Sequence, residues 1–439
     1  MSDDHIEPLD DTTDSPTPDG AALLERVRGL PGGRELLEAA ELHEGRVELV
    51  GGAVRDIMLG SPPRELDVIV DSGVERLGGV LAERLQGTLT LHERFGTAVV
   101  RGSEANIDLA TIRAESYCVP GALPDIQPGT PEQDLERRDF TVNAIALGLA
   151  GEYAGGLRAA LSALDDLAAR RLRVLHDASF REDPTRILRL ARYAARLGFE
   201  IEPHTAVLLS EALRAGALHT LSGQRLGAEL RLALAEPDPV ASLAELDRIG
   251  VLSAWEPGLS FDEHVARLAL EIMPDDGSVQ TMLAASLLLE LCDSLDDPET
   301  EPKMRGFLHD LQLPSGDGDR TFGVAVTASF AIDHVAGTDT TVDLLELTIG
   351  ASVESLALAA AVCELDEGPD AYGRLIFEEW LGERRHVTLE VTGDDLIAAG
   401  VPEGPEVGVR LEESYKLLLE ERIEPGRESE LRAALEARI

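Results

Sequence analysis

Two residue patterns follow one another along this chain of 439 residues, and the change between them lies near Gly155 and Gly156. Before the two glycines, runs that contain β-branched residues and are bounded by Gly, Pro or Asn predict strands. These runs are 47–52, 64–71, 87–95, 97–102 and 106–113. Helices are predicted at 21–30, at 73–86 and after Asp139. We therefore expect the first part of the chain to be an α+β head with a mixed sheet and helices.

Beyond Leu157, nearly every segment has helical spacing. Clusters of Gly, Pro and Asp separate these segments, and no repeat of fixed period is present. The clearest helical segments are 187–199, 206–216, 223–239, 242–252 and 281–295. The change of pattern predicts a mixed head followed by a long, all-α remainder.

The cysteines and the N-terminus bear on the compartment. Cys118, Cys292 and Cys363 are scattered and odd in number, which fits neither a disulfide framework nor a zinc site and suggests buried free thiols. Residues 1–20 are acidic and polar, lack the features of a signal peptide, and are expected to form a disordered tail. No apolar run approaches the roughly 20 residues that span a bilayer. These features favour a cytoplasmic protein.

The formal net charge of −43 is extreme. Residues 1–235 carry 25 basic and 38 acidic side chains, whereas residues 236–439 carry 14 and 44. On charge alone, nucleic acid would be an unexpected partner, because Lys and Arg drive phosphate binding. Only two of the 39 basic residues are Lys. This bias is compatible with a salt-rich cytoplasm or with GC-rich codon usage, and composition leaves both open.

Glu65 and Asp67 lie two residues apart at the start of a predicted strand. Side chains at positions i and i+2 share one face, so two carboxylates would lie side by side, as a Mg²⁺ site requires. A solvated strand end is the ordinary alternative for a bare pair of acids. Asp108 on a later predicted strand supplies a third carboxylate, and three could hold two metal ions.

Gly51 and Gly52 precede these acids and let the backbone turn tightly beside a ligand. The helix expected from about Ala53 would aim free N–H groups at an anion, and Arg55 adds a planar charged donor. Together with the acids, this glycine corner predicts a site for a nucleoside triphosphate and its metal.

The segment 135–147 places Arg137, Arg138, Asp139 and Asn143 around an expected helix start, with Asp139 as the N-cap. Two interpretations remain open. The segment is compatible with an arginine that binds a triphosphate, with Asn143 near the sugar. It is equally compatible with a capped surface helix.

The segment 181–199 is more informative, because Asp183 and Pro184 predict a helix start. At about 100° per residue, four arginines form one stripe on this helix, and no acid occurs between Asp183 and Glu200. The four are Arg186, Arg189, Arg192 and Arg196. A solvated helix face usually mixes signs, so the stripe predicts contact with phosphate or base.

In their order and spacing, these segments resemble the bacterial-type (class II) tRNA nucleotidyltransferases and their poly(A) polymerase relatives. The resemblance implies a nucleotidyltransferase head at 21–155, a helical neck that recognises the nucleotide base at 156–235, a helical body at 236–380 and a helical, tRNA-binding tail at 381–439. The segments that carry it are GGAVRDIMLG (51–60), RELDVIV (64–70), IDLATIR (107–113), DLERRDFTVNAIAL (134–147), REDPTRILRLARYAARLGF (181–199), GQRLGAEL (223–230) and TGDDLIAAGVPEGPEVGVRL (392–411).

The resemblance implies template-independent addition of CMP, AMP or both from CTP and ATP to the 3′ end of tRNA, with release of pyrophosphate. The chain would add all of CCA, only CC, or only A. In the last two cases, a second nucleotidyltransferase would complete the end. Residues 117–130, expected to form a loop between head strands, could govern the switch from C to A. The alternatives are a catalytically silent RNA-binding relative, a poly(A) polymerase, and an enzyme that modifies a small molecule or a protein.

The resemblance also implies roles for individual residues. Glu65, Asp67 and Asp108 would be the catalytic carboxylates that hold Mg²⁺. Cytosine and adenine both have an amino group and a ring nitrogen that accepts hydrogen bonds. Asp183 would accept a hydrogen bond from the amino group, and Arg186 would donate one to the ring nitrogen. The nucleotide site would consist of Gly51, Gly52, Arg55, Arg137, Arg138, Asp139, Asn143, Asp183, Arg186, Arg189 and Arg192.

Two features depart from the family pattern. Glu65 stands where the family usually has Asp, and its extra methylene would move the carboxylate by roughly 1 Å, which can cost about 100-fold in rate unless the strand adjusts. Many relatives carry an HD phosphohydrolase domain. Here His309-Asp310 is the only His-Asp pair, it has no supporting His cluster, and we interpret it as a chance pair on a helix.

Overall fold

The computed structural model describes residues 19–92, 96–313, 316–337, 348–365 and 371–437. These residues fall into two compact units. The first unit extends to Glu229 and includes Arg248–Trp255, and the second contains Leu230–Asp247 and the chain from Glu256 onward. The finer division into head, neck, body and tail stays a prediction. Residues 1–18 of the expected disordered tail lie outside the described residues.

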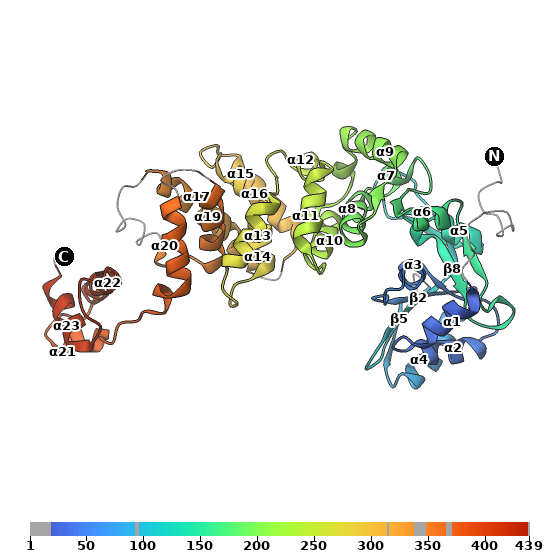
Figure 1. Ribbon diagram of the computed structural model, residues 1–439, viewed down its shortest axis with the longest axis horizontal. Coiled ribbons are helices and arrows are strands. Elements are labelled where there is room, and N and C mark those ends of the chain that lie inside the picture. The colour runs from blue at the N-terminus through green and yellow to red at the C-terminus, as the bar shows by residue number, and fades with distance from the viewer. Residues whose placement is uncertain (1–18, 93–95, 314–315, 338–347, 366–370, 438–439) are drawn as a thin grey trace. The chain divides into compact units, whose positions relative to one another are not determined.

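The head is built on a seven-stranded mixed sheet (Figure 1). Its strands are β1 Val47–Val50, β2 Leu66–Val70, β3 Thr88–His92, β4 Thr97–Arg101, β5 Asn106–Thr111, β8 Ile145–Gly148 and β9 Leu157–Ala159. Their order is β3-β4-β5-β2-β1-β8-β9, and only β2 and β5 are parallel neighbours. The five predicted strands are confirmed over the described residues. The sheet continues past the expected head boundary at residue 155.

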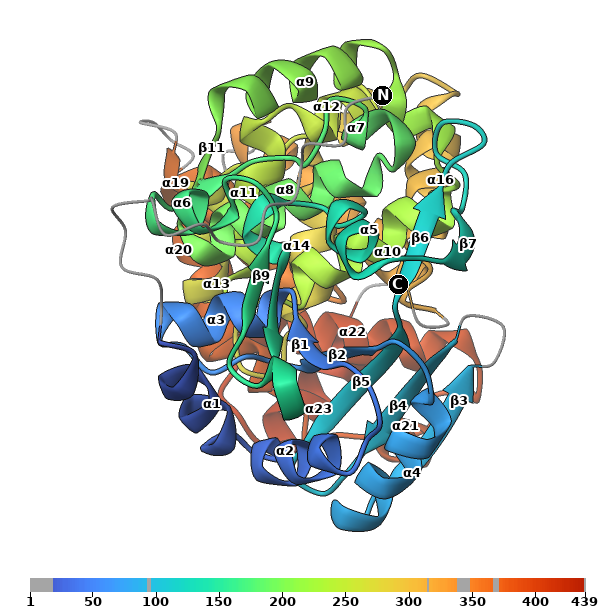
Figure 2. The ribbon, with the colours of Figure 1, turned by 90° about the vertical axis from the view of Figure 1, so that its right-hand side faces the viewer.

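Helices pack on this sheet. The helices of the head and its junction are α1 Gly20–Arg28, α2 Gly33–Glu41, α3 Gly52–Leu59, α4 Val74–Arg84, α5 Pro131–Glu136 and α6 Ala163–Ala168. α4 packs against β3, β4 and β5 and against α2, whereas α3 packs against β1, β2 and β8 (Figure 2). α4 buries Val74, Leu77 and Leu81, which are three and four residues apart and form one apolar stripe.

The prediction of a helix after Asp139 is wrong. Thr141–Asn143 forms a single 3₁₀ turn, and Ile145–Gly148 forms β8. All four residues of β8 are buried, and the strand lies between β1 and β9 in the sheet. A short apolar run without alternation fits a buried strand or a helix equally well, so its pairing partners decided the outcome.

Two small sheets differ from the predictions. β6 Arg113–Ser116 pairs with β7 Asp125–Pro128, so the predicted loop at 117–130 contains a strand. In the neck, β10 Arg171–Leu172 and β11 Glu200–Ile201 form a short parallel pair, so the neck is not entirely helical. The prediction of buried thiols holds for Cys292 and Cys363 but is wrong for Cys118, which is exposed between β6 and β7.

From residue 179 onward, the described chain is predominantly helical, as predicted. The neck contains α7 Ser179–Glu182, α8 Thr185–Leu197, α9 Pro203–Arg214 and α10 Gly223–Leu234. The helices that follow are α11 Pro239–Arg248, α12 Val251–Trp255, α13 Glu263–Ile272, α14 Val279–Ser286, α15 Leu289–Cys292, α16 Thr300–Leu311, α17 Asp317–Gly337, α19 Val353–Leu365 and α20 Ala371–Gly382. His309 and Asp310 lie on α16, and the His309 side chain is 86% exposed. No helix among the described residues combines the length and apolarity needed to cross a membrane.

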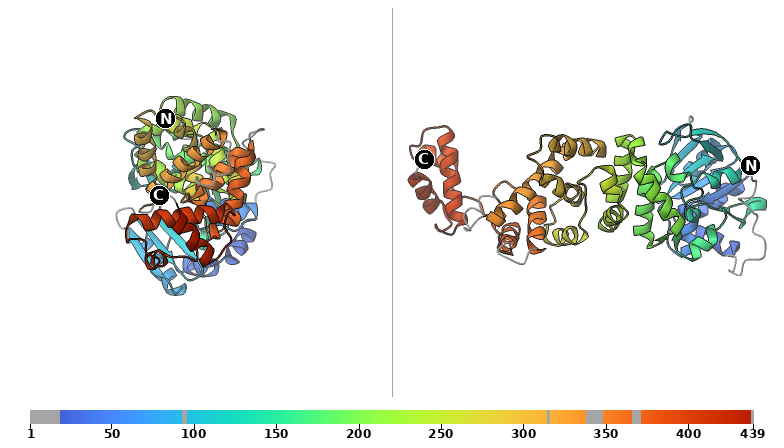
Figure 3. Two further views of the ribbon diagram at one scale, coloured as in Figure 1. Left: turned by 90° about the vertical axis from the view of Figure 1, so that its left-hand side faces the viewer. Right: turned by 90° about the horizontal axis from the view of Figure 1, so that it is seen from above.

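The described part of the predicted tail contains three further α-helices: α21 Gly393–Ala398, α22 Pro405–Leu419 and α23 Arg427–Glu436. Each packs against the other two (Figure 3). Leu396, Val401 and Ala434 form their small buried core. With so little apolar area, the tail also depends on polar contacts, of which the buried Glu430 makes several.

Replacing Glu430 with Gln should loosen the tail. The carboxylate accepts the N–H groups of Glu390 at 2.6 Å, Val391 at 2.9 Å and Gly426 at 3.1 Å. The amide would turn its NH₂ group toward an N–H donor, so we expect a loss of about 2 kcal/mol. Hydrogen–deuterium exchange should become faster at these three amides. Glu428→Gln, which changes an exposed acid on the same helix, is the control. Unchanged protection at the three amides would contradict the expected role of Glu430.

Candidate active site

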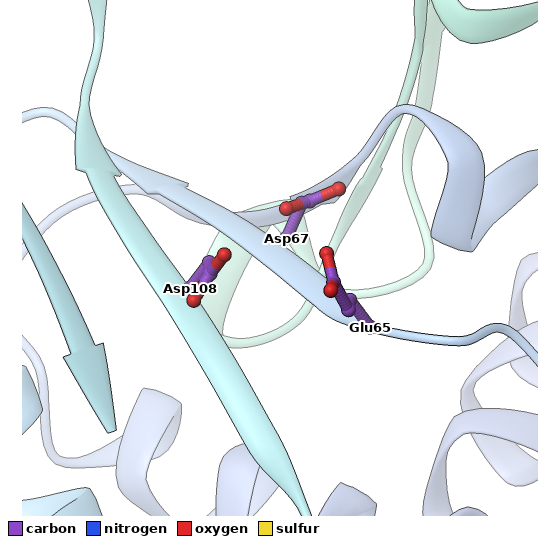
Figure 4. A group of neighbouring side chains, drawn as sticks. All are labelled: Glu65, Asp67 and Asp108. Atoms are coloured by element: carbon purple, nitrogen blue, oxygen red, sulfur yellow. The ribbon is translucent and has the colours of Figure 1, made fainter. Parts of the chain in front are cut away.

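Three carboxylates lie together on the head sheet. β2 and β5 are parallel neighbours, and Asp67 is paired in register with Asp108. Glu65 lies just before β2, and its side chain points toward the other two (Figure 4). One oxygen of each side chain lies within 4.8 Å of the others. The structure therefore brings the three predicted acids together, and no other such group of His, Cys, Asp and Glu occurs in the described part of the chain.

The electrostatics of this triad suit a cation. Burial raises the pKa of Asp67 to about 6. The charges of Asp108 and Glu65 act in the same direction, whereas Arg138 and Arg189 oppose them. Burial also raises the pKa of Asp108 above its usual value. A divalent metal ion would relieve the repulsion between the carboxylates, and a ligand set of oxygen atoms alone suits a hard cation, so the triad fits a divalent metal ion.

The glycine corner lies between β1 and α3. Gly51 has φ of +72°, where a side chain would be strained, and a Cβ there would lie 2.7 Å from Nη1 of Arg138. A Cβ on Gly52 would lie 3.3 Å from Nη2 of Arg55. The two glycines therefore leave room for two guanidinium groups, which the sequence did not indicate. Their contact with a nucleotide stays a prediction.

A chain of polar contacts runs from α3 to α8. Arg55 is only 1% exposed, and its guanidinium pairs with Asp56 at 2.7 Å and donates to Oδ1 of Asn143. Asn143 donates to Asp139 at 2.9 Å, and Asp139 pairs with Arg189 at 2.6 Å. Four of the predicted nucleotide-binding residues are thus joined in one network. Direct contact between Arg55 and a triphosphate stays a prediction.

Asp139 does not cap an α-helix, contrary to the prediction, because the turn that follows it is 3₁₀. Its carboxylate accepts the N–H of Phe140 at 2.8 Å. Burial by itself would raise the pKa of Asp139, but Arg189 and the hydrogen bond from Asn143 hold it below its usual value. The carboxylate is therefore charged and holds a guanidinium group that belongs to the neck.

Arg137 and Arg138 form hydrogen bonds and ion pairs with Asp134. The sequence pattern did not identify Asp134 as part of the site. Asp134 is fully buried on α5. Its Oδ1 accepts two hydrogen bonds from Arg137, at 2.8 and 3.0 Å, and its Oδ2 accepts one from Arg138 at 3.0 Å. Glu115 on β6 accepts a further bond from Arg137 at 3.0 Å. The available signal was the spacing of three and four residues between Asp134 and the two arginines, which is typical of ion pairs on one helix turn.

The arginines of α8 have acidic or polar partners on other elements. Arg186 is buried and donates to Oγ of Ser179 at 2.6 Å and to the carbonyl of Arg137 at 2.7 Å. Arg192 donates to Glu229 of α10 at 3.3 Å. The acids that α8 itself lacks are therefore supplied by segments distant in the sequence, which helical spacing alone cannot reveal.

Asp183 lies between α7 and α8, and α8 begins at Thr185, slightly later than predicted. Oδ1 of Asp183 accepts the hydroxyl of Thr185 at 2.7 Å. Arg225 of α10 donates to the same oxygen at 2.8 Å and to the carbonyl of Gly121 at 2.6 Å. Arg225 belongs to the GQRLGAEL segment, to which the sequence analysis assigned no individual role.

Three carboxylates on a mixed sheet, beside guanidinium groups from a helical neck, form the kind of site that metal-dependent phosphoryl transfer uses. Residues 47–173 match the family model of the poly(A) polymerase head domain. The chain is 35% identical over 355 residues to the CC-adding tRNA nucleotidyltransferase of Deinococcus radiodurans, covering 73% of this chain and 92% of the relative. The chain therefore belongs to the bacterial-type tRNA nucleotidyltransferase and poly(A) polymerase family.

Two further similarities extend along most of the chain. It is 31% identical over 393 residues to the A-adding tRNA nucleotidyltransferase of Geobacter sulfurreducens, covering 85% of this chain. The chain spans 43%, 27% and 54% of the lengths of three A-adding relatives. The solved Thermotoga maritima CCA-adding enzyme complexed with tRNA has a TM-score of 0.74 at 25% identity, covering 95% of this chain and 98% of that one. The predicted order of a mixed head and a helical remainder is thus also found in a known relative.

Proposed function

We propose that this chain transfers CMP, AMP or both from CTP and ATP to the 3′ end of tRNA, using Mg²⁺ and releasing pyrophosphate, in the cytoplasm. One observation carries the proposal. Arg138 and the neck residue Arg189 both lie close enough to Asp67 to lower the pKa of its carboxyl. This nearness supports a single site formed by the candidate metal ligands and the candidate nucleotide-binding arginines.

The known relatives support this reading. Similar curated proteins are named A-adding and CC-adding tRNA nucleotidyltransferases and multifunctional CCA protein. Similar solved structures are of CCA-adding enzymes with tRNA, with ATP and with CTP. These names cover three different products, so the product of this chain, CCA, CC or A, is a question for experiment.

Glu65, Asp67 and Asp108 would hold the metal. Their oxygen ligands favour Mg²⁺ over softer cations. Bound there, divalent cations would activate the attacking hydroxyl and neutralise charge on the leaving pyrophosphate. Glu65 reaches within 4.8 Å of the other two carboxylates, so its longer side chain is compatible with the triad.

Other side chains would orient the nucleotide. Arg138 and Arg189 would direct donors to the phosphates beside the carboxylates. Asp183 would accept from the amino group of cytosine or adenine while Arg186 donates to the ring nitrogen. Because Oδ1 of Asp183 already accepts hydrogen bonds from protein groups, the base would use Oδ2.

Three tRNAs that end before CCA, after the first C and after CC test the function. With Mg²⁺, CTP and ATP, we expect extension by part or all of CCA, and sequencing of the products identifies which. EDTA should abolish the extension, and added Mg²⁺ should restore it. A long tail of A residues would instead identify a poly(A) polymerase. Absence of incorporation into all three tRNAs, at low and at molar salt, would overturn the proposal.

A further inference from the structure

Tyr193 on α8 is surrounded by four guanidinium groups. The tyrosine is only 8% exposed. The guanidinium carbons of Arg196, Arg192, Arg55 and Arg189 lie 5.0, 5.2, 5.6 and 5.8 Å from its ring centroid. The chain has 82 acidic residues and only 39 Lys and Arg residues, so this gathering of cations is contrary to its average composition.

The four arginines come from two parts of the first unit. Arg189, Arg192 and Arg196 lie on α8, whereas Arg55 comes from α3 in the head. Like charges held this close repel one another. The face of an aromatic ring attracts a cation within about 6 Å, and the ring of Tyr193 is a partner that all four arginines share. The ring therefore offsets part of the repulsion that their convergence creates.

The hydroxyl and the ring of Tyr193 make further contacts. Nη2 of Arg189 donates to the Tyr193 hydroxyl at 3.2 Å. Phe140 packs against the ring with centroids 5.9 Å apart and planes at 82°. Phe140 directly follows Asp139, whose carboxylate pairs with Arg189 at 2.6 Å. Tyr193 thus contacts Arg189 and also the segment that supplies the counter-charge of Arg189.

We propose that Tyr193 is a positioning residue that aims the guanidinium groups of Arg189 and Arg192 at the nucleotide. This inference rests on the proposed function, in which these two arginines contact the phosphate or the base. The ring lies beside both arginines and orients their guanidinium groups, and it therefore affects the affinity for the nucleotide. The hydroxyl accepts a hydrogen bond from Arg189, and we expect its removal to have the smaller effect.

Two substitutions separate these contributions. Tyr193→Phe removes the hydroxyl and keeps the ring, whereas Tyr193→Leu removes both. We expect Kd and KM for CTP and ATP to rise about threefold in the first variant and about tenfold in the second, with little change in kcat. Equilibrium binding of each nucleotide without tRNA, together with steady-state kinetics, measures these effects.

Tyr153→Leu is the matched control. Tyr153 lies in the 3₁₀ turn Gly151–Tyr153 between β8 and β9, and its ring centroid is 4.2 Å from the guanidinium carbon of Arg46. This substitution also removes a ring from beside an arginine, but in a part of the head that contributes no residue to the candidate site. We expect nucleotide Kd and KM to remain at their wild-type values.

The outcomes distinguish this inference from the proposed function. If the wild-type protein binds neither CTP nor ATP, the proposed function fails. If it binds them and both Tyr193 variants bind equally well, only the role of Tyr193 fails. A merely structural role predicts a lower Tm and a smaller active fraction with unchanged KM, and that result would overturn the inference. Should Tyr193→Leu not fold, an unchanged KM in Tyr193→Phe overturns it as well.

Discussion

Asp67→Asn should make the metal-free protein more stable and at the same time remove its activity. Burial raises the pKa of Asp67 from 3.8 to about 6. Keeping this carboxylate ionised at neutral pH therefore costs the folded state on the order of 3 kcal/mol. Asn has nearly the same shape and no charge, so Tm in EDTA should rise by several degrees. The loss of a metal-binding oxygen should lower the rate of nucleotide addition on the order of a thousandfold.

The pH dependence of stability gives an independent readout of the same carboxyl. Between pH 3.8 and about 6, folded Asp67 retains a proton that the unfolded chain has released. Its contribution to the unfolding free energy therefore falls as pH rises through this window and is lost above it. The Asn variant lacks this contribution, so its advantage in Tm over the wild type should grow from acidic to neutral pH. Thermal unfolding in EDTA at a series of pH values measures the difference.

Asp71→Asn, directly after the same strand, is the control. Asp71 directly follows β2, is exposed and accepts the N–H of Arg46 at 3.2 Å, which an amide oxygen can also do. We expect its activity and Tm to match the wild type. A lower Tm for Asp67→Asn than for the wild type at neutral pH would contradict the cost of ionising this buried carboxylate. Full activity of that variant would contradict its assignment as a metal ligand.

Asp134→Asn should have the opposite effect on stability. The substitution removes the buried counter-charge of Arg137 and Arg138, and breaking such a pair from one side costs about 3–5 kcal/mol. We expect Tm to fall by roughly 10 °C. Because both arginines belong to the candidate nucleotide site, kcat/KM for CTP and ATP should fall by about tenfold or more. Thermal unfolding and steady-state kinetics check the two effects.

The sign of the pH effect at Asp134 is also the reverse of that at Asp67. Burial opposes its ionisation, but Arg138 and Arg137 hold the pKa of Asp134 below its usual value. The stabilisation is therefore complete at neutral pH and is lost only as pH falls through that lowered pKa. Glu136→Gln on the same helix alters an exposed acid and should change stability by less than about 0.5 kcal/mol. Equal Tm values for the Asp134 and Glu136 variants would contradict the prediction.

Much of the candidate site was readable from the sequence because its signals are local. The spacing of Glu65 and Asp67 predicted two carboxylates on one face of a strand, and the pairing of β2 with β5 adds Asp108. The change of pattern near Gly155 and Gly156 predicted a mixed head and a helical remainder. These features depend on residues a few positions apart, where backbone geometry alone determines which side chains share a face.

The remaining features depend on contacts between segments that are distant in the sequence. A four-residue buried run carries no period, so only its position between β1 and β9 made Ile145–Gly148 a strand instead of a helix. No acid occurs within the α8 stripe itself, and only the fold shows that Glu229 from α10 pairs with Arg192. Helical spacing describes one element, and it contains no information about what packs against that element.

By itself, the sequence determined five of the strands of the head, the meeting of Glu65 with Asp67 and the basic stripe of α8, because periodicity and spacing are properties of neighbouring residues. Only the tertiary structure decided which polar group or aromatic ring contacts each arginine. Arg55 and Asn143 are 88 positions apart, and four arginines from two helices meet at Tyr193. Burial in the folded chain removes water from these groups, so each guanidinium must find an acid or a ring, and the fold determines which one it finds.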